Sequence, residues 1–224
     1  MHKWFVYKEF TEAAKEASEF LANNIDKCIV TKGVCHVILP GGNTPVPSLK
    51  LLAKKSLPWI KVHWYLGDER CCPQGYADRN DLMLEKHLWS RISETNIHHI
   101  LAELGAEKAA ELYRDEIKSI GTFDIAFLGM GEDGHTASLF PAHEALEDNR
   151  SVIPVYHSPK PPPERVTLSI ETLRQTKVKI VLVSGKEKAT VISRIKKGES
   201  LPINNIGDIH WFIDEAANTV DIEL

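Results

Sequence analysis

The sequence predicts an α/β fold, a doubly wound and mostly parallel sheet with helices on both faces. Short apolar, β-branched runs such as residues 34–39 and 178–183 alternate along the chain with longer amphipathic segments such as residues 11–24. This alternation is typical of βα units, in which each helix returns the chain to the start of the next parallel strand. Ligands of such folds bind outside the carboxyl ends of the strands, so the strand-to-helix turns are expected to carry the function.

Each predicted element follows from its local pattern. Segments of four to six residues that are apolar and β-branched are expected to be strands, and segments with apolar residues every three or four positions are expected to be helices. In chain order, the strands are residues 4–7, 34–39, 62–66, 123–128, 152–155, 166–169, 178–183 and 211–214, and the helices are residues 11–24, 46–55, 79–89, 106–120 and 186–196. The proline-rich residues 158–163 predict a stiff surface loop.

Size and composition predict one globular domain over residues 1–224. The chain is 43% hydrophobic and 26% charged, and its net charge of -4 gives no general attraction to nucleic acid or to anionic lipid. Residues 1–10 lack a signal-like apolar run, and no apolar stretch approaches the roughly 20 residues that span a bilayer. Its four cysteines form no C-x-x-C pair. We therefore expect a reduced, cytoplasmic protein, monomeric or weakly dimeric, without nucleic-acid or membrane partners.

The turn over residues 40–45 predicts a phosphate site. Gly41 and Gly42 permit backbone angles that other residues avoid, Thr44 is a candidate helix N-cap, and Pro45 suits the first helical position. A glycine turn that ends at a helix N-terminus offers free N–H groups and the positive end of the helix dipole to an anion. A tight, well-capped turn with no ligand explains the same residues equally well.

The turn over residues 184–188 breaks a local rule. Ser184 and Glu187 form an S-x-x-E capping box, but Lys186 and Lys188 fall in the first helical turn, where the helix dipole disfavours cations. A bound phosphate would offset that cost, because it gains from both the ammonium groups and the backbone N–H groups. Two solvated surface lysines are the alternative.

The turn over residues 129–135 matches G-x-G-x-x-G, but a dinucleotide site is not expected there. Glu132 and Asp133 would repel a pyrophosphate, and Pro141 stops any long helix after the turn. The turn instead presents His135 beside Asp133, and an imidazole with a nearby carboxylate can take a proton from water at neutral pH. A lone histidine in a loop is more often structural, but its place on the edge that also holds the candidate anion site favours catalysis.

The turn over residues 67–70 places Asp68, Glu69 and Arg70 at a strand end. A surface ion-pair cluster is one interpretation. The functional interpretation gives one carboxylate a polar or proton-handling role and gives Arg70 an anionic or hydroxyl-rich substrate.

Taken together, these segments resemble the motifs of the 6-phosphogluconolactonase family, in the superfamily of the glucosamine/galactosamine-6-phosphate isomerases. The matching segments are LPGGNTP (39–45), GDER (67–70), LGMGEDGHTASLFP (128–141), RVTL (165–168), GxxKA (185–189) and WxxDxxA (211–217). The longest of them is the most specific, and the resemblance covers almost the whole chain. The family often has serine at the position of Asn43.

The resemblance implies a Rossmann-like fold and hydrolysis of 6-phosphoglucono-δ-lactone to 6-phosphogluconate, the second step of the oxidative pentose phosphate pathway, without a metal or an organic cofactor. By the same resemblance His135 is the general base, and Asp68, Arg70 and Asp133 line the reacting end. The remaining carried-over residues form the phosphate site: Gly41, Gly42, Asn43, Thr44, Arg165 and Lys188. Arg165 precedes its predicted strand, so only the resemblance places it in the site.

Two other functions compete with lactone hydrolysis. An aminosugar-phosphate deaminase/isomerase shares the glycine turn and the Asp-Gly-His segment, but its pattern has glutamate just before the proline, where this chain has Phe140 before Pro141. A sugar-phosphate sensor of the transcription-regulator type needs a DNA-binding module, and only three residues precede the first predicted strand. That alternative also gives His135 no role.

Overall fold

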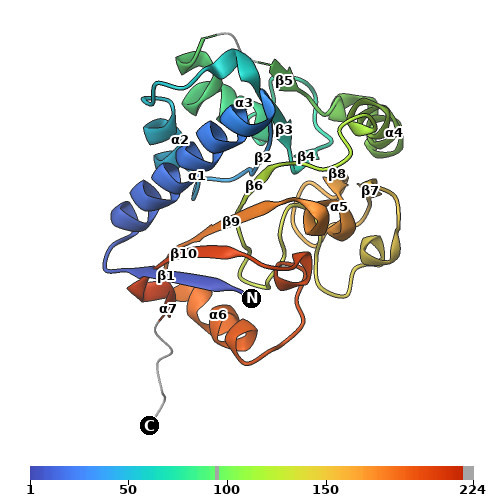
Figure 1. Cartoon of the computed structure of the whole chain (residues 1–224). Coiled ribbons are helices and arrows are strands. Elements are labelled where there is room, and N and C mark those ends of the chain that lie inside the picture. Colours follow the sequence, from blue (N-terminus) through green and yellow to red (C-terminus); the bar gives the residue numbers. More distant parts are fainter. Residues whose placement is uncertain (94–95, 219–224) are drawn as a thin grey trace.

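The computed structural model describes residues 1–93 and 96–218 (Figure 1). Within these residues the main sheet has the strand order β1, β10, β9, β6, β2, β3, β5, and all its neighbouring strands are parallel. Their bounds are β1 (Lys3–Tyr7), β2 (Cys35–Leu39), β3 (Val62–Leu66), β5 (Asn96–His98), β6 (Ile125–Leu128), β9 (Val178–Val183) and β10 (His210–Asp214). The predicted doubly wound fold is confirmed.

The helices alternate with these strands. They are α1 (Phe10–Lys32), α2 (Val46–Leu52), α3 (Asn80–His87), α4 (Ala106–Ile117), α5 (Ile170–Gln175), α6 (Ala189–Lys196) and α7 (Glu215–Asn218). Short 3-10 turns precede or join them: η1 (Trp59–Lys61), η2 (Trp89–Arg91), η3 (Ala102–Leu104), η4 (Glu144–Glu147), η5 (Lys186–Lys188) and η6 (Asn204–Ile206).

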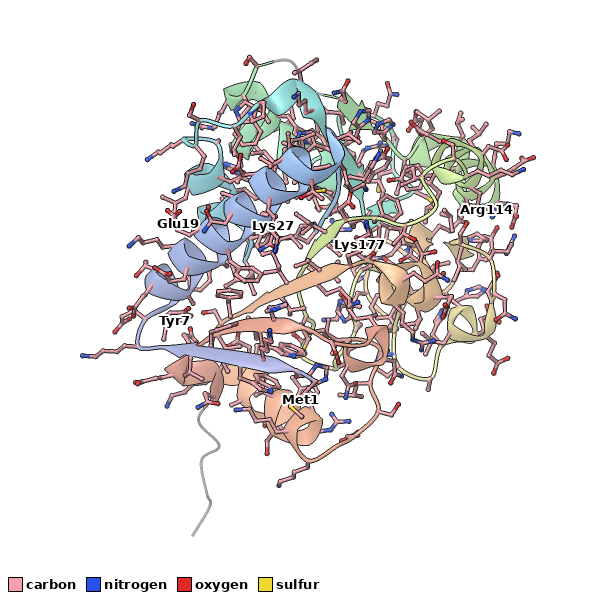
Figure 2. The ribbon with its side chains drawn as sticks, viewed as in Figure 1. Met1, Tyr7, Glu19, Lys27, Arg114 and Lys177 are labelled. Atoms are coloured by element: carbon pink, nitrogen blue, oxygen red, sulfur yellow. The ribbon has the colours of Figure 1, made fainter. Side chains whose placement is uncertain are left out.

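Helices α1 and α4 cover opposite faces of the main sheet. Cys28 of α1 meets Cys35 of β2, whereas Glu116, in the last turn of α4, contacts His98 of β5. The ring of His98 stacks on Tyr65, whose hydroxyl bonds His36 of β2. Because consecutive strand residues point to opposite faces, the contacts of Cys35 and His36 place the two helices on the two sides of the sheet. Charged side chains such as Lys27 of α1 and Arg114 of α4 lie at the surface (Figure 2).

A second sheet departs from the prediction. Strands β4 (Asp68–Arg70), β8 (Arg165–Leu168) and β7 (Val152–Val155) form a separate antiparallel sheet. The segments of β7 and β8 were expected as strands of a largely parallel sheet, and β4 and β5 were not expected as strands at all. Both missed strands have three residues, which is too short for an alternating pattern to show.

Helix ends also differ from the sequence prediction. Helix α1 continues past residue 24 to Lys32, because Ile25 and Ile29 keep the buried spacing and Gly33, at φ 81°, forms the left-handed C-cap. Helix α5 was missed, although the side chain of Ser169 caps it by accepting a bond from the Thr172 N–H. Within the described residues, no helix combines the length and the apolarity needed to cross a membrane.

Candidate active site

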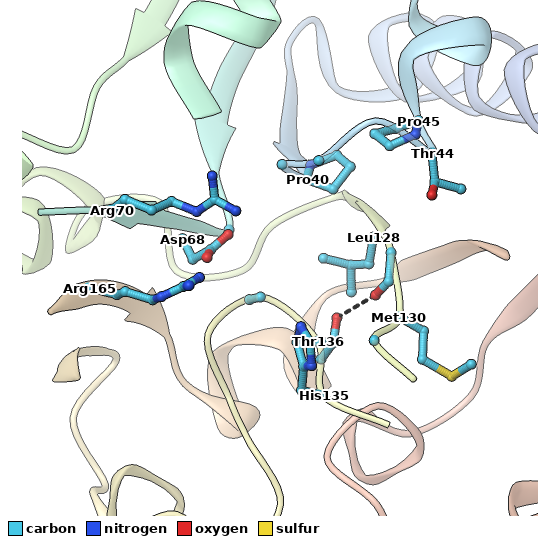
Figure 3. A pocket seen from close by; sticks show the side chains of 16 residues that line it. Pro40, Thr44, Pro45, Asp68, Arg70, Leu128, Met130, His135, Thr136 and Arg165 are labelled. Carbon is cyan, nitrogen blue, oxygen red and sulfur yellow. Dashed lines mark hydrogen bonds between the residues drawn. The ribbon is translucent and has the colours of Figure 1, made fainter. Parts of the chain in front are cut away.

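The four turns predicted to share one edge follow β2, β3, β6 and β9, which are adjacent in the parallel sheet. The chain builds the sheet outward in one direction from β2 and in the other from β6, so the boundary between these strands is the switch point at which open α/β sheets bind ligands. A cavity of about 180 Å³ opens there. Its lining residues are Pro40, Gly41, Gly42, Thr44, Pro45, Gly67, Asp68, Arg70, Leu128, Gly129, Met130, Gly131, His135, Thr136, Ala137 and Arg165 (Figure 3).

His135 and Asp133 form a tightly bonded pair in the turn after β6. The Asp133 Oδ1 atom lies 2.5 Å from His135 Nδ1 and 3.0 Å from the His135 backbone nitrogen. An ionised carboxylate only accepts, so Nδ1 carries the proton and Nε2 keeps the lone pair. The arrangement fixes the tautomer that a general base needs.

Glycine is required beneath this imidazole. A Cβ atom on Gly131 would lie 2.0 Å from His135 Nδ1 and 2.8 Å from Asp133 Oδ1. Gly134 adopts φ 86°, in the left-handed region, and Leu201 packs against it. The missing side chain at Gly131 therefore leaves the space that the ring of His135 occupies at the cavity wall.

Burial and the Asp133 carboxylate shift the pKa of the His135 imidazole in opposite directions. Burial lowers the pKa of His135, and the charge and hydrogen bond of Asp133 raise it, with burial the larger effect. Burial also raises the pKa of Asp133, but the N–H and the ring of His135 more than offset this and leave that pKa below its ordinary value. At neutral pH the pair is therefore a neutral imidazole beside a carboxylate.

Asp68 is held at the cavity wall by neighbours from two other segments. Ser138 Oγ donates to Asp68 Oδ2 over 2.6 Å, and Asn80 Nδ2 donates to Asp68 Oδ1 over 3.1 Å. All three side chains are buried. Their bonds fix the orientation of a carboxylate that lies across the cavity from His135 (Figure 3).

The adjacent Glu69 points away from the cavity and caps α3. Its carboxylate accepts from the backbone N–H groups of Arg70, Asn80 and Asp81 over 2.8 to 2.9 Å. Complete burial raises the pKa of Glu69 to about 7. The two carboxylates of this turn therefore differ in role, which their adjacency in sequence could not separate.

Arg70 and Arg165 are cross-strand partners in the small sheet. Because β4 and β8 are antiparallel, the first residue of β8 faces the last residue of β4, and both guanidinium groups reach the cavity (Figure 3). This pairing explains how Arg165, which the sequence could place only by resemblance, comes to line the cavity from the start of a strand.

Arg165 also uses most of its hydrogen-bonding capacity inside the protein. Its Nε and Nη2 atoms donate to the carbonyls of Pro162, Lys160 and Pro161 over 2.9 to 3.1 Å, and Nη1 lies 3.4 Å from Ser138 Oγ. A guanidinium has five N–H groups, so one remains for a ligand. Arg165 therefore organises the proline-rich loop as well as lining the cavity.

The glycine turn lies at the opposite wall from the arginines. A Cβ atom on Gly41 would lie 1.9 Å from Asn80 Oδ1, so glycine is needed for this turn to pack against Asn80. Gly42 has φ 79° and faces open space. Asn43 is exposed and does not contribute to the cavity lining described above.

The predicted capping by Thr44 is wrong. Helix α2 begins at Val46, Pro45 occupies the N-cap position, and no side chain caps the helix. Pro47 follows within the first turn, where its missing N–H needs no partner. Thr44 instead lines the cavity.

The predicted capping box at Ser184 and Glu187 is also wrong. Ser184 Oγ donates to Asp214 Oδ2 over 2.5 Å, and the following turn is the 3-10 helix η5, whose N-cap residue is Gly185. Lys188 ends this turn, and its Nζ lies 3.8 Å from Glu132 Oε2. Lys188 therefore belongs to the turn beside the cavity but is not among the lining residues.

Sequence reasoning assigned no supporting role to Asn80 or Ser138, and it used Phe140 only to separate this chain from the deaminase pattern. The Phe140 ring is buried with its centroid 4.6 Å from that of His135 and 5.7 Å from the Arg165 guanidinium carbon. The bonds of Asn80 and Ser138 to Asp68 join separate segments, so no local pattern signals them.

A possible metal cluster lies elsewhere. Among the described residues, Cys28, Cys35 and Asp124 hold potential ligand atoms within 4.8 Å of one another. They lie at the amino end of the sheet, and Asp124 already accepts from Lys32 and Lys177 over 2.6 and 3.1 Å. The cluster takes no part in the cavity.

A base-like imidazole and several cations at the switch point of a doubly wound sheet define an α/β protein built to bind and act on a small anion. Residues 8–211 match the family described as glucosamine-6-phosphate isomerases/6-phosphogluconolactonase, and the chain belongs to that family. Its relatives include proteins named 6-phosphogluconolactonase.

The relative from Thermotoga maritima is 35% identical over 189 residues, which cover 82% of this chain and 84% of the relative. The relative from Bos taurus is 37% identical over 234 residues, with 95% and 91% covered. A crystal structure of 6-phosphogluconolactonase from Thermotoga maritima matches the fold with a TM-score of 0.90 at 31% identity, over 96% of this chain and 100% of that one.

Proposed function

We propose that the protein is a 6-phosphogluconolactonase that hydrolyses 6-phospho-D-glucono-1,5-lactone to 6-phospho-D-gluconate, the second step of the oxidative pentose phosphate pathway. The observation that carries this proposal is the 2.5 Å contact of His135 Nδ1 with Asp133 Oδ1 at the wall of the switch-point cavity. Membership of the family limits the candidate reactions to isomerisation and lactone hydrolysis of sugar phosphates. The base-like imidazole and the arginines at the cavity suit the hydrolysis of an anionic lactone.

His135 acts as the general base for water. Its lowered pKa keeps the imidazole neutral at physiological pH, so Nε2 can take a proton as the water oxygen attacks the lactone carbonyl. The Asp133 carboxylate then stabilises the imidazolium that forms. General-base help of this kind contributes about 10²- to 10⁴-fold to a rate.

The cationic groups and the glycine turn hold the anionic end of the substrate. Gly41, Gly42, Asn43 and Thr44 offer backbone N–H groups, and Arg165 and Lys188 supply positive charge on other sides. Anchoring the phosphate places the lactone carbonyl near His135, and such positioning is a large part of the catalysis of an inherently hydrolysable ester.

Asp68 and Arg70 act at the reacting end. Arg70 Nε is buried without a protein partner among the described residues, so it is available to a substrate oxygen. The charge of Arg70 would stabilise the oxyanion of the tetrahedral intermediate, and Asp68 would accept a hydrogen bond from a ring hydroxyl. This chemistry needs no metal, organic cofactor or covalent nucleophile.

The residue at position 140 argues against the deaminase function. Phe140 packs against His135 where the deaminase pattern has a glutamate for acid chemistry, and its ring is buried. No residue at that position can then donate a proton for ring opening.

A paired assay tests the proposal. Acid release from freshly prepared 6-phosphogluconolactone is followed in a pH-stat, and ammonia release from glucosamine 6-phosphate is followed in parallel. We expect acid release well above the spontaneous rate and no ammonia. Ammonia release without lactone turnover would replace the proposal with the deaminase function.

A further inference from the structure

Glu132 lies between two lysines that come from different loops beside the cavity. Its Oε1 atom accepts from Lys160 Nζ over 2.8 Å, and its Oε2 atom lies 3.8 Å from Lys188 Nζ. Lys160 belongs to the proline-rich loop and Lys188 to the turn after β9, whereas Glu132 belongs to the His135 turn. One carboxylate thus joins the three segments on this side of the cavity.

The backbone at Lys160 is fixed in place. Its carbonyl accepts from Arg165 Nη2 over 2.9 Å and from Ser158 Oγ over 2.8 Å, and Ser158 N–H donates to the Pro163 carbonyl over 2.9 Å. Arg165 therefore positions the loop that presents Lys160. The positive charge of Lys160 is also close enough to His135 to lower the pKa of the imidazole.

The two ammonium groups have different surroundings from the arginines. Most of the N–H groups of Arg165 bond to the proline-rich loop, whereas, among the described residues, the flexible ends of Lys160 and Lys188 contact the exposed carboxylate of Glu132. The side chain of Glu132 is 59% exposed, so it can swing into water at little cost. A dianionic phosphate would attract both lysines more strongly than a single carboxylate does.

We propose that Lys160 and Lys188 form a two-lysine clamp for the substrate phosphate, and that Glu132 is its internal counter-ion, which the phosphate displaces. The proposal rests on the proposed function and adds Lys160 and Glu132 to its phosphate site. In the free protein Glu132 holds the two lysines together and offsets one of their two positive charges, and it lowers the affinity for every ligand that must replace it.

The test compares Glu132→Gln with the parent protein. Removing the competing charge should tighten binding of 6-phosphogluconate, measured by calorimetry, by about fivefold, and should lower KM for the phosphorylated lactone with kcat unchanged. For glucono-δ-lactone, which lacks the phosphate, kcat/KM should not change. Glu85→Gln, an exposed glutamate on α3, is the control for net charge.

Lys160→Met tests the clamp in the opposite direction, because it removes one of the two positive charges. It should weaken 6-phosphogluconate binding about tenfold and, at a pH well above the pKa of His135, leave glucono-δ-lactone turnover close to that of the parent protein, whereas Lys186→Ala, an exposed lysine in the same turn as Lys188, should have little effect on either. Weaker or unchanged binding in Glu132→Gln would overturn the proposal, as would an equal effect on both lactones. Lactone turnover by the parent protein decides the proposed function separately, because the calorimetric binding of 6-phosphogluconate tests the clamp without any turnover.

Discussion

Ser138 Oγ donates a 2.6 Å hydrogen bond to Asp68 Oδ2 and so joins the segment after β6 to the start of β4, seventy residues away in the sequence. The two residues are fully or nearly fully buried. This bond and the one from Asn80 leave the Asp68 carboxylate a single orientation toward the cavity.

Ser138→Ala should therefore lower kcat/KM for the lactone by about tenfold, because a hydrogen bond to a charged group contributes about 1.5–3 kcal/mol. Steady-state kinetics measure the change, and Ser200→Ala, at an exposed serine, is the matched control. Kinetics unchanged from the parent would show that the orientation of Asp68 does not matter to the reaction.

Asp133→Asn should shift the pH dependence of the reaction. Burial lowers the pKa of His135 and Asp133 raises it, so removing the carboxylate should lower the imidazole pKa further. The acid limb of kcat/KM should move to lower pH, and kcat at neutral pH should fall by about 10²-fold or more because the imidazolium loses its partner. An acid limb at the same pH in both proteins would mean that another group titrates.

Gly131→Ala should disable the site without abolishing the fold. The new methyl group would lie 2.0 Å from His135 Nδ1, so the imidazole must move away from Asp133. We expect kcat to fall by about 10²-fold, since a displacement of this size misaligns a general base. Gly129→Ala, for which the added Cβ has no neighbour within 4 Å, should lose far less activity. Equal losses in the two variants would contradict the account.

Glu69→Ala should affect stability. The substitution removes the acceptor of two backbone N–H groups at the start of α3 and of the Arg70 N–H in β4, which should cost about 3 kcal/mol of unfolding free energy.

The effect of Glu69→Ala should also depend on pH. The folded-state pKa of Glu69, about 7, lies above its unfolded value. The contribution of this carboxyl group to the free energy of unfolding is therefore complete below the unfolded pKa and is lost as the pH rises through 7. Urea denaturation should show a larger difference from the parent at pH 5 than at pH 8. The opposite order would show that the carboxylate is ionised throughout.

The alternation of apolar runs and amphipathic segments was sufficient to predict the parallel sheet and the shared edge of the four turns, because both follow from strand direction alone. It could not assign β7 and β8 to a separate sheet, since a strand's partner is set by long-range contacts. The predicted helix caps were wrong for a related reason. Ser184 and Glu187 have the spacing of a capping box, but the hydroxyl of Ser184 bonds instead to Asp214, 30 positions away in the sequence.

The site residues differ in how far sequence could place them. His135 and Asp133 lie in one glycine-rich turn, so their contact follows from a local motif. Arg165 reaches the cavity only because β4 and β8 pair in antiparallel register, and Lys160 is held beside Glu132 by a loop whose carbonyl groups accept from Arg165. Nothing within either local segment predicts these positions.

The most direct measurement is acid release from 6-phosphogluconolactone by the parent protein and by His135→Ala, with 6-phosphogluconate binding measured on the same samples. We predict that the rate of acid release falls by at least about 10²-fold in the variant, toward the spontaneous rate, while its affinity for 6-phosphogluconate stays close to that of the parent. Hydrolysis by the variant at the parent's rate would contradict the role of His135 as the base.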